Sequence, residues 1–205
     1  MLELVGVMDR LRRECPWDQQ QTHESLAPYL LEEAHEVLEG LDGGDRSALR
    51  EELGDLLLQV LFHARIAQEH PEDPWGIDEV AGDARTKMVH RHPHVFAGRD
   101  VSGVDEVAAN WEQLKASEKA RPSVLDGVPP SLPALARADK VLGRLERAGY
   151  EPSEPPGAMR RSDADRATGT ALLAQVREAR AAGVDAEGAL RRTLHELESA
   201  VRAAE

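Results

Sequence analysis

Apolar residues recur along most of the chain at intervals of three and four. Within residues 2–13, Leu4, Met8 and Leu11 follow this spacing, which is typical of an amphipathic helix. The same pattern predicts further helices over residues 22 or 25 to 41, 46–69, 78–91, 104–120 and 133–149, and two more within about 163–204. No stretch alternates with a period of two over the length of a strand. The predicted fold class is therefore all-α.

Breaking and capping residues separate these helices. Cys15-Pro16-Trp17-Asp18 interrupts the first helix, and Thr22 or Ser25 is the expected N-cap of the second. Asp42-Gly43-Gly44-Asp45 predicts a turn in which Asp45 caps the third helix. Two long helices joined by so short a turn favour an antiparallel hairpin.

Proline-rich segments divide the chain into three expected parts. One such segment covers residues 121–133, and a second runs from Tyr150 to Gly157. We therefore expect a helical domain over residues 1–120, a connector with one helix over residues 121–157, and a helical tail over residues 158–205.

Carboxylates are placed at matching positions in the predicted hairpin. Glu33 and Glu36 are three residues apart on one helix, and Glu52 and Asp55 are three apart on the next, so each pair shares a helix face. The pairs lie at similar distances before and after the turn, and both helices rise about 1.5 Å per residue. Four carboxylates are therefore expected to converge, although one such pair alone would more simply be a solvated surface.

The third helix carries a polar stripe made of Glu52, Asp55, Gln59 and His63. From Leu53 to Ala67 this helix is apolar nearly all round, so it is expected to be buried on several sides and the stripe to face another helix. Clustered carboxylates repel one another unless a cation lies between them. Hard oxygen ligands favour Mg²⁺, with Mn²⁺ as the alternative. His35 and His63 fit packing or supporting roles better than ligand roles.

Charge further restricts the ligand. The net charge is −13, so a nucleic acid would be repelled by most of the surface. A small anion needs a metal or a local basic patch, and residues 85–99 form such a patch. Lys87 and Arg91, four apart on one helix, can reach one anion, and arginine offers phosphate a planar fork. The alternative is an ordinary basic surface turn.

Other composition features concern aromatic rings and compartment. Trp17 and Trp111 are each able to stack on a base, or else to pack in the core. The single cysteine, Cys15, cannot form an internal disulfide, which favours a reducing compartment. No apolar run approaches the roughly 18 residues that span a membrane, and the N-terminus lacks signal-peptide features. A soluble, cytoplasmic protein without membrane or nucleic-acid partners is expected.

Several short motifs together resemble one enzyme family. They are Cys15-Pro16-Trp17-Asp18, Gln21-Thr22-His23, Pro28-Tyr29, the two acidic blocks around Glu33 and Glu52, Arg91-His92-Pro93-His94-Val95-Phe96 and Trp111-Glu112-Gln113-Leu114-Lys115. The combination resembles the MazG nucleoside triphosphate pyrophosphohydrolases over roughly residues 5–140. Each motif alone is weak, but their order and combination are specific.

The resemblance implies a helical bundle, usually dimeric, that hydrolyses nucleoside or deoxynucleoside triphosphates to the monophosphate and pyrophosphate with Mg²⁺. It further implies house-cleaning of the nucleotide pool. Carried over by motif position, the metal-binding and catalytic residues are Glu33, Glu36, Glu52 and Asp55, with Glu32 in support. The implied substrate-binding residues are Lys87 and Arg91 for the phosphates and Trp111 and Lys115 near the nucleoside, with Trp17 as a further candidate.

Two alternatives to this function stay open. One is a related all-α hydrolase restricted to a pyrimidine deoxynucleotide. The other is a non-catalytic helical module for regulation or dimerisation, against which the intact carboxylates argue. The sequence leaves undetermined the preferred base and sugar, the number of metal ions, and whether water attacks the α- or the β-phosphorus.

The tail resembles a degenerate second repeat of the first domain. When Leu57-Leu58 is aligned with Leu172-Leu173, apolar positions are partly retained. The charged positions are replaced: Glu52 by Ala167, Asp55 by Thr170, Lys87 by Leu194 and Arg91 by Glu198. Some MazG proteins contain two tandem domains, so residues 158–205 are expected to be non-catalytic and to pack against the first domain. Chance similarity between Ala-, Arg- and Leu-rich helices is the alternative.

Overall fold

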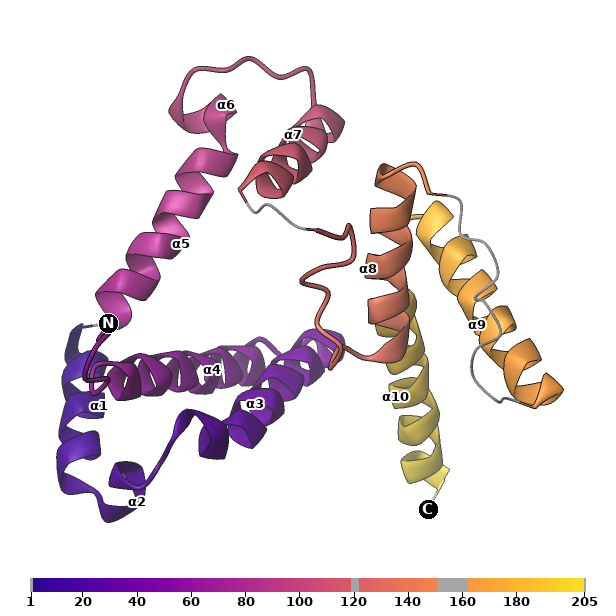
Figure 1. The fold of residues 1–205 in the computed structure, drawn as a ribbon. Coiled ribbons are helices and arrows are strands. Elements are labelled where there is room, and N and C mark those ends of the chain that lie inside the picture. The colour runs from indigo at the N-terminus through magenta and orange to yellow at the C-terminus, as the bar shows by residue number, and fades with distance from the viewer. Residues whose placement is uncertain (1, 119–121, 151–161, 205) are drawn as a thin grey trace. The chain divides into compact units, whose positions relative to one another are not determined.

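The computed structural model describes residues 2–118, 122–150 and 162–204. Every regular element in these ranges is an α-helix, which confirms the all-α class (Figure 1). In chain order the helices are α1 (Leu2–Glu14), α2 (Pro16–Gln19), α3 (His23–Gly43), α4 (Arg46–Ala67), α5 (Ile77–Arg91), α6 (Pro93–Phe96), α7 (Val104–Ser117), α8 (Ala134–Arg147), α9 (Asp163–Ala181) and α10 (Ala186–Ala204). Within these ranges no helix is both long and apolar enough to cross a membrane.

The helices form two compact units, Met1–Glu118 and Lys119–Glu205. The first contains α1 to α7, and the second contains α8, α9 and α10, which pack on one another. The expected three-part division stays a prediction. Of the second proline-rich segment, residues 151–157 lie outside the described residues.

Side-chain caps define the ends of the central hairpin. The Thr22 hydroxyl accepts a hydrogen bond from the Ser25 backbone N–H, and the Ser25 hydroxyl accepts one from the Thr22 N–H, which together form a capping box at the start of α3. The Asp45 carboxylate accepts from two N–H groups in the first turn of α4. Both predicted caps are confirmed. The turn is shorter than expected, because only Gly44, at φ 69°, and Asp45 lie between the helices.

Two prolines begin single-turn helices where the sequence predicted only a break or a stop. Pro16 is at the start of α2, and Pro93 is at the start of α6. Proline fits the first helical position because it has no N–H to leave unpaired and its φ is already helical. Each proline therefore ends the preceding helix and starts the next.

The core of the first unit lies where α1, α3 and α4 meet. Met8, Leu26, Leu61 and Phe62 are its buried members. The expected burial of α4 on several sides holds in its C-terminal half, where Leu61, Phe62, Ala64 and Ala67 are buried. Leu53 and Val60 are less covered, at 49% and 37% exposed. In the first unit α4 is covered mainly by α3 and α1, which leaves part of its apolar surface open.

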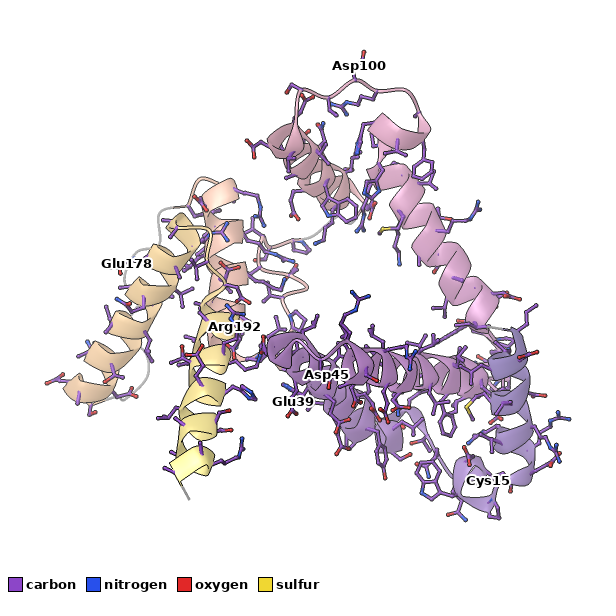
Figure 2. The ribbon with its side chains drawn as sticks, turned by 180° about the vertical axis from the view of Figure 1, so that it is seen from behind. Cys15, Glu39, Asp45, Asp100, Glu178 and Arg192 are labelled. Atoms are coloured by element: carbon purple, nitrogen blue, oxygen red, sulfur yellow. The ribbon has the colours of Figure 1, made fainter. Side chains whose placement is uncertain are left out.

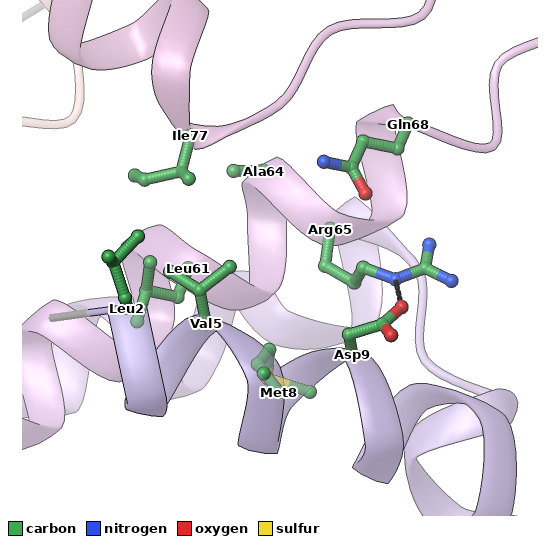
Figure 3. A pocket seen from close by; sticks show the side chains of 10 residues that line it. Leu2, Val5, Met8, Asp9, Leu61, Ala64, Arg65, Gln68 and Ile77 are labelled. Atoms are coloured by element: carbon green, nitrogen blue, oxygen red, sulfur yellow. Dashed lines mark hydrogen bonds and ion pairs between the residues drawn. The ribbon is translucent and has the colours of Figure 1, made fainter.

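Two arginines attach α1 to the C-terminal end of α4. Arg12 is buried and forms a bidentate pair with Glu69, with Nε and Nη2 at 3.0 and 2.8 Å from the carboxylate oxygens. Arg65 binds both Glu69, at 3.0 Å, and Asp9, at 2.9 Å. Figure 3 shows the Arg65–Asp9 pair beside a mainly apolar pocket between α1, α4 and the first residue of α5, which Gln68 also lines. None of the predicted metal ligands lines this pocket.

In the second unit, Leu142 of α8 and Val176 of α9 are buried. Arg180 joins α9 to α8 through Asp139, at 3.0 Å, and Glu146, at 3.2 Å. The apolar positions of α10 are less covered, since Leu190, Leu194 and Leu197 are 49%, 48% and 61% exposed. Packing of the tail against the first domain stays a prediction.

Helices α3 and α4 approach each other closely at Gly40. A Cβ atom built on this buried glycine would lie 3.1 Å from both the Cα and the backbone N of Leu49. Backbone atoms cannot rotate away as a side-chain tip can. The absence of a side chain at Gly40 therefore sets how near the two helices come.

We expect Gly40→Ala to lower the melting temperature. Overpacking of a close contact costs about 1–3 kcal/mol, more than the roughly 0.5–1 kcal/mol that alanine gains over glycine within a helix. Gly6→Ala is the matched control, because Gly6 is an exposed helical residue with nothing within 4 Å of its built Cβ, and it should be neutral or stabilising. Equal stabilisation by both changes in thermal unfolding would contradict the close approach.

Candidate active site

Three of the four predicted carboxylates converge. Glu33 and Glu36 on α3 and Glu52 on α4 each offer an oxygen, and these atoms all lie within 4.8 Å of one another. Helices α3 and α4 pack along much of their lengths, so the turn of the hairpin brings the two acidic blocks level. The predicted convergence of these three is confirmed, whereas their role as metal ligands stays a prediction.

Asp55 and Glu32 lie around this group. Asp55 is exposed one turn further along α4, and its negative charge acts on both Glu33 and Glu52. Glu32 is exposed on α3. Asp55 is therefore close enough to contribute to the electrostatics of the group, while Glu32 lies at its edge.

The carboxylates disfavour one another's charge. Burial raises the pKa of Glu33, and the negative charges of Asp55, Glu36 and Glu52 raise it further. Burial also raises the pKa of Glu52, followed by the charges of Glu36, Glu51 and Asp55. A carboxyl whose pKa is higher in the folded state stabilises the fold at low pH, and this contribution is lost as the pH rises through the folded value. At neutral pH the group is therefore under electrostatic repulsion.

A divalent cation fits this arrangement. The donors are all carboxylate oxygens, the ligand type that Mg²⁺ and Mn²⁺ prefer. In the described ranges none of Glu33, Glu36 and Glu52 forms an ion pair with Lys or Arg. No Lys or Arg side chain of the described residues therefore offsets the repulsion among these three carboxylates.

The polar stripe continues along α4 to a histidine pair. Gln59 is buried, as expected for a stripe that faces α3, and its Oε1 has no partner among the described residues. The Nδ1 atoms of His63 and of His23 on α3 are 2.8 Å apart, with the rings stacked at 5.1 Å between centroids. Burial lowers the pKa of His63, and the charge of His23 lowers it further. His63 therefore serves helix packing, whereas His35 is exposed.

The predicted substrate-binding residues form a separate group. Arg91, at the end of α5, donates from Nε and Nη2 to the Glu118 carboxylate at 3.0 and 2.6 Å. Its guanidinium carbon lies 5.2 Å from the ring centre of Trp111 on α7. Lys115 lies 3.9 Å from Glu112, and Lys87 is exposed on α5. Arg91 and Trp111 are thus in contact.

This group is not brought to the carboxylates. Figure 1 shows that the C-terminal end of α5, with α6 and α7, extends away from the hairpin of α3 and α4 within the first unit, and Figure 2 shows the same separation from behind. Only the N-terminal end of α5 joins the core, through Ile77. The expected phosphate ligands and metal ligands therefore occupy two distinct places in this conformation.

Trp17 lies in neither group. It is half exposed on α2, and its ring makes edge contacts with Tyr29 and Phe62 at centroid distances of 6.0 and 6.3 Å. These contacts favour a packing role. Its binding of substrate stays a prediction.

Sequence reasoning did not single out Glu118 or His23 as partners. Glu118 follows Trp111 by seven residues, which is two helical turns, so the two lie on one side of α7. That spacing places Glu118 near Trp111, but it carries no information about a pairing with Arg91 on another helix. His23 and His63 are 40 residues apart, and no local spacing joins them.

The fold and the acidic group define the class: an all-helical protein with a candidate divalent-metal centre in a helical hairpin. The sequence model of the MazG nucleotide pyrophosphohydrolase domain matches residues 21–96. An uncharacterised 26.1 kDa protein of Streptomyces cacaoi is 47% identical over 206 aligned positions, which cover all of this chain and 82% of that protein. The chain belongs to the MazG family.

Relatives with a named activity are longer. The nucleoside triphosphate pyrophosphohydrolase of Mycolicibacterium smegmatis is 48% identical over 162 residues, covering 78% of this chain and 50% of that protein. This chain therefore spans half the length of that relative. The crystal structure of a MazG-related protein from Thermotoga maritima has a TM-score of 0.49 and 28% identity, over 56% of this chain and 98% of that one.

The histidine pair gives a pH-dependent prediction. The pKa of His63 is lower in the folded state than its ordinary 6.5, so its contribution to stability is present above that pH and is lost as the pH falls. We expect the unfolding free energy of the wild type to fall more steeply between about pH 7.5 and 5.5 than that of His63→Gln, because only the wild type has His63 to protonate. The carboxylates titrate in both proteins and therefore cancel in the comparison. Identical slopes in chemical denaturation would contradict the coupling.

Proposed function

We propose that this chain is a Mg²⁺-dependent nucleoside triphosphate pyrophosphohydrolase. The observation that carries the proposal is the convergence of Glu33, Glu36 and Glu52 within 4.8 Å on a half-buried hairpin. Family membership supports it, and so does the named activity of relatives of which this chain covers about half the length. Mn²⁺ is the alternative ion.

The reaction joins one water to the triphosphate and releases pyrophosphate. Glu33, Glu36, Glu52 and Asp55 would hold the ion, which supplies charge neutralisation of the phosphates and a more acidic bound water. Glu36 or a neighbouring carboxylate would orient the water. The water oxygen bonds to the α- or the β-phosphorus, the bridging P–O bond breaks, and either attack gives monophosphate and pyrophosphate. One proton leaves the water in the process.

Cationic side chains would hold the phosphate chain. Arg91 offers N–H donors, and Lys87 lies one turn earlier on the same helix. Because their end of α5 extends away from the hairpin in this conformation (Figure 1), the bound state would require α5 and α7 to close over a carboxylate group, their own or that of a second copy. Trp111 and Lys115 would then lie near the nucleoside.

A homodimer is part of the proposal. Leu31 on α3, next to the supporting Glu32, and Leu53 on α4, next to Glu52, are 61% and 49% exposed. Exposed leucines on adjoining helices favour association, because burial contributes about 25 cal/mol per Å² of apolar surface. A second copy would cover this side of the hairpin.

The tail is proposed to be catalytically silent. The positions aligned with Glu52, Asp55, Lys87 and Arg91 are Ala167, Thr170, Leu194 and Glu198. The carboxylate-bearing helices of the first unit therefore supply all the chemistry. The expected role of α9 and α10 is structural.

The metal assignment is tested by turnover. Glu36→Gln and Asp55→Asn should each abolish pyrophosphate release from a panel of canonical and modified nucleoside triphosphates, while helix content by circular dichroism stays unchanged. Wild type should need Mg²⁺ or Mn²⁺ and lose activity with chelator. The exposed Glu39→Gln, on the same helix, is the matched control and should keep wild-type rates.

Several outcomes would count against this assignment. Wild-type rates in either variant at saturating Mg²⁺ would refute the carboxylate roles. Activity in Glu52→Gln/Asp55→Asn would assign chemistry elsewhere, including the tail. Turnover of one pyrimidine deoxynucleotide alone would favour the narrower hydrolase, and no turnover by wild type would favour the non-catalytic module.

The phosphate role of Arg91 is tested by binding. Arg91→Ala should weaken nucleoside triphosphate binding much more than monophosphate binding, because its proposed contact is with the phosphate chain. A charge-assisted hydrogen bond contributes about 1.5–3 kcal/mol, which is roughly ten- to hundredfold in Kd. Calorimetric titration in the presence of Mg²⁺ measures both constants, and equal losses for the two ligands would rule out this role.

A further inference from the structure

Arg91 has a carboxylate partner that no metal or substrate role explains. Glu118 follows the last residue of α7 and lies 27 positions beyond Arg91 in the chain. We propose that Glu118 is the positioning residue that orients the Arg91 guanidinium for phosphate binding. This inference rests on the proposed phosphate role of Arg91.

The two side chains meet in a fork. Arg91 Nε lies 3.0 Å from Glu118 Oε1, and Arg91 Nη2 lies 2.6 Å from Oε2. Two parallel bonds fix the plane of the guanidinium as well as its distance. The Arg91 and Glu118 side chains are 13% and 22% exposed, and the pair lies at the protein surface, where a ligand can reach it.

An aromatic ring fixes the same guanidinium from its face. The centre of the Trp111 ring is 5.2 Å from the Arg91 guanidinium carbon, within cation–π range. The ring of His92 in turn packs against Trp111 at 4.9 Å and 65°. Edge and face together leave the guanidinium little rotational freedom, which lowers the entropy lost when a ligand binds.

The fork leaves donors for a ligand. A guanidinium carries five N–H bonds, and the pair with Glu118 uses one on Nε and one on Nη2. Nη1 has no hydrogen-bond acceptor in the described ranges. The end edge of the guanidinium, formed by Nη1 and Nη2, can therefore donate hydrogen bonds to phosphate oxygens while the side edge stays on Glu118.

Charge near the fork remains suitable for an anion. The hydrogen bond from Arg91 lowers the pKa of Glu118, and the charges of Arg91, His90 and Lys87 lower it further. Glu118 is thus ionised at neutral pH and neutralises Arg91 in part, while Lys87 adds a second cation beside the pair. The charge of Glu112 also acts on Arg91, but Glu112 has Lys115 3.9 Å away. The cations Arg91, Lys87 and Lys115 thus exceed the carboxylates Glu118 and Glu112 by one charge.

A simple clamp between α5 and α7 would show the same contacts, so the test must separate positioning from fold. A double-mutant cycle with Arg91→Ala and Glu118→Ala does this, with inorganic tripolyphosphate as the probe and Mg²⁺ present, in the full chain. Glu118→Ala should weaken tripolyphosphate binding about tenfold, the lower end of the effect that orienting partners have on ligand affinity. In the Arg91→Ala background the same change should have no further effect.

Control variants complete the cycle. Glu118→Gln keeps one acceptor oxygen and should lie between wild type and Glu118→Ala. Glu106→Gln, which weakens the hydrogen bonds of Glu106 to Ser102 at the start of α7, should leave tripolyphosphate binding unchanged. Monophosphate binding should change little in Glu118→Ala, Glu118→Gln and Glu106→Gln.

Each contrary outcome has its own meaning. Tighter tripolyphosphate binding by Glu118→Ala would show that Glu118 competes with phosphate, and would overturn the inference. If Glu118→Ala lowers tripolyphosphate affinity equally in the wild-type and the Arg91→Ala backgrounds, the role of Glu118 is purely structural and the inference is overturned. Absence of tripolyphosphate binding by the wild type would also overturn the inference. If the double-mutant cycle shows coupling but no triphosphate releases pyrophosphate in the turnover assay, the inference is upheld and the proposed activity is refuted.

Discussion

Repulsion among carboxylates in the α3–α4 hairpin is the constraint on which the proposed chemistry depends. Glu33, Glu36 and Glu52 are held within 4.8 Å of one another, and burial together with neighbouring negative charge raises the pKa of Glu33 and Glu52. Such an arrangement opposes folding at neutral pH. A bound cation would relieve this repulsion, so in the proposed function the feature that destabilises the free protein would also provide the affinity for the metal.

The rest of the first unit keeps those charges together. Gly40 allows the close approach of α3 to Leu49 on α4, and the caps Thr22 and Asp45 fix where each helix begins. At the far end of α4, the pairs of Arg12 with Glu69 and of Arg65 with Asp9 attach α1. These contacts are made by short-range packing and hydrogen bonds, which can offset the local repulsion.

The sequence was informative wherever spacing along a helix decides the geometry. It predicted the helices, both caps and the level arrangement of the acidic blocks, because a short turn and a rise of about 1.5 Å per residue determine which residues of a hairpin meet. It did not predict the pairing of Arg91 with Glu118 or of His23 with His63. Those contacts depend on how separate helices pack, and local spacing carries no information about that. It also did not predict that Leu53 and Val60 of α4 stay partly exposed, because an apolar face does not say what covers it.

The position of the metal is measured most directly by anomalous diffraction from crystals grown with Mn²⁺. A strong anomalous peak between α3 and α4, within about 2.0–2.3 Å of oxygens from Glu33, Glu36 and Glu52, is the expected result. Its disappearance in Glu36→Gln crystals grown under the same conditions would confirm the ligands. A peak elsewhere, or none on the hairpin at saturating Mn²⁺, would contradict the carboxylate metal centre.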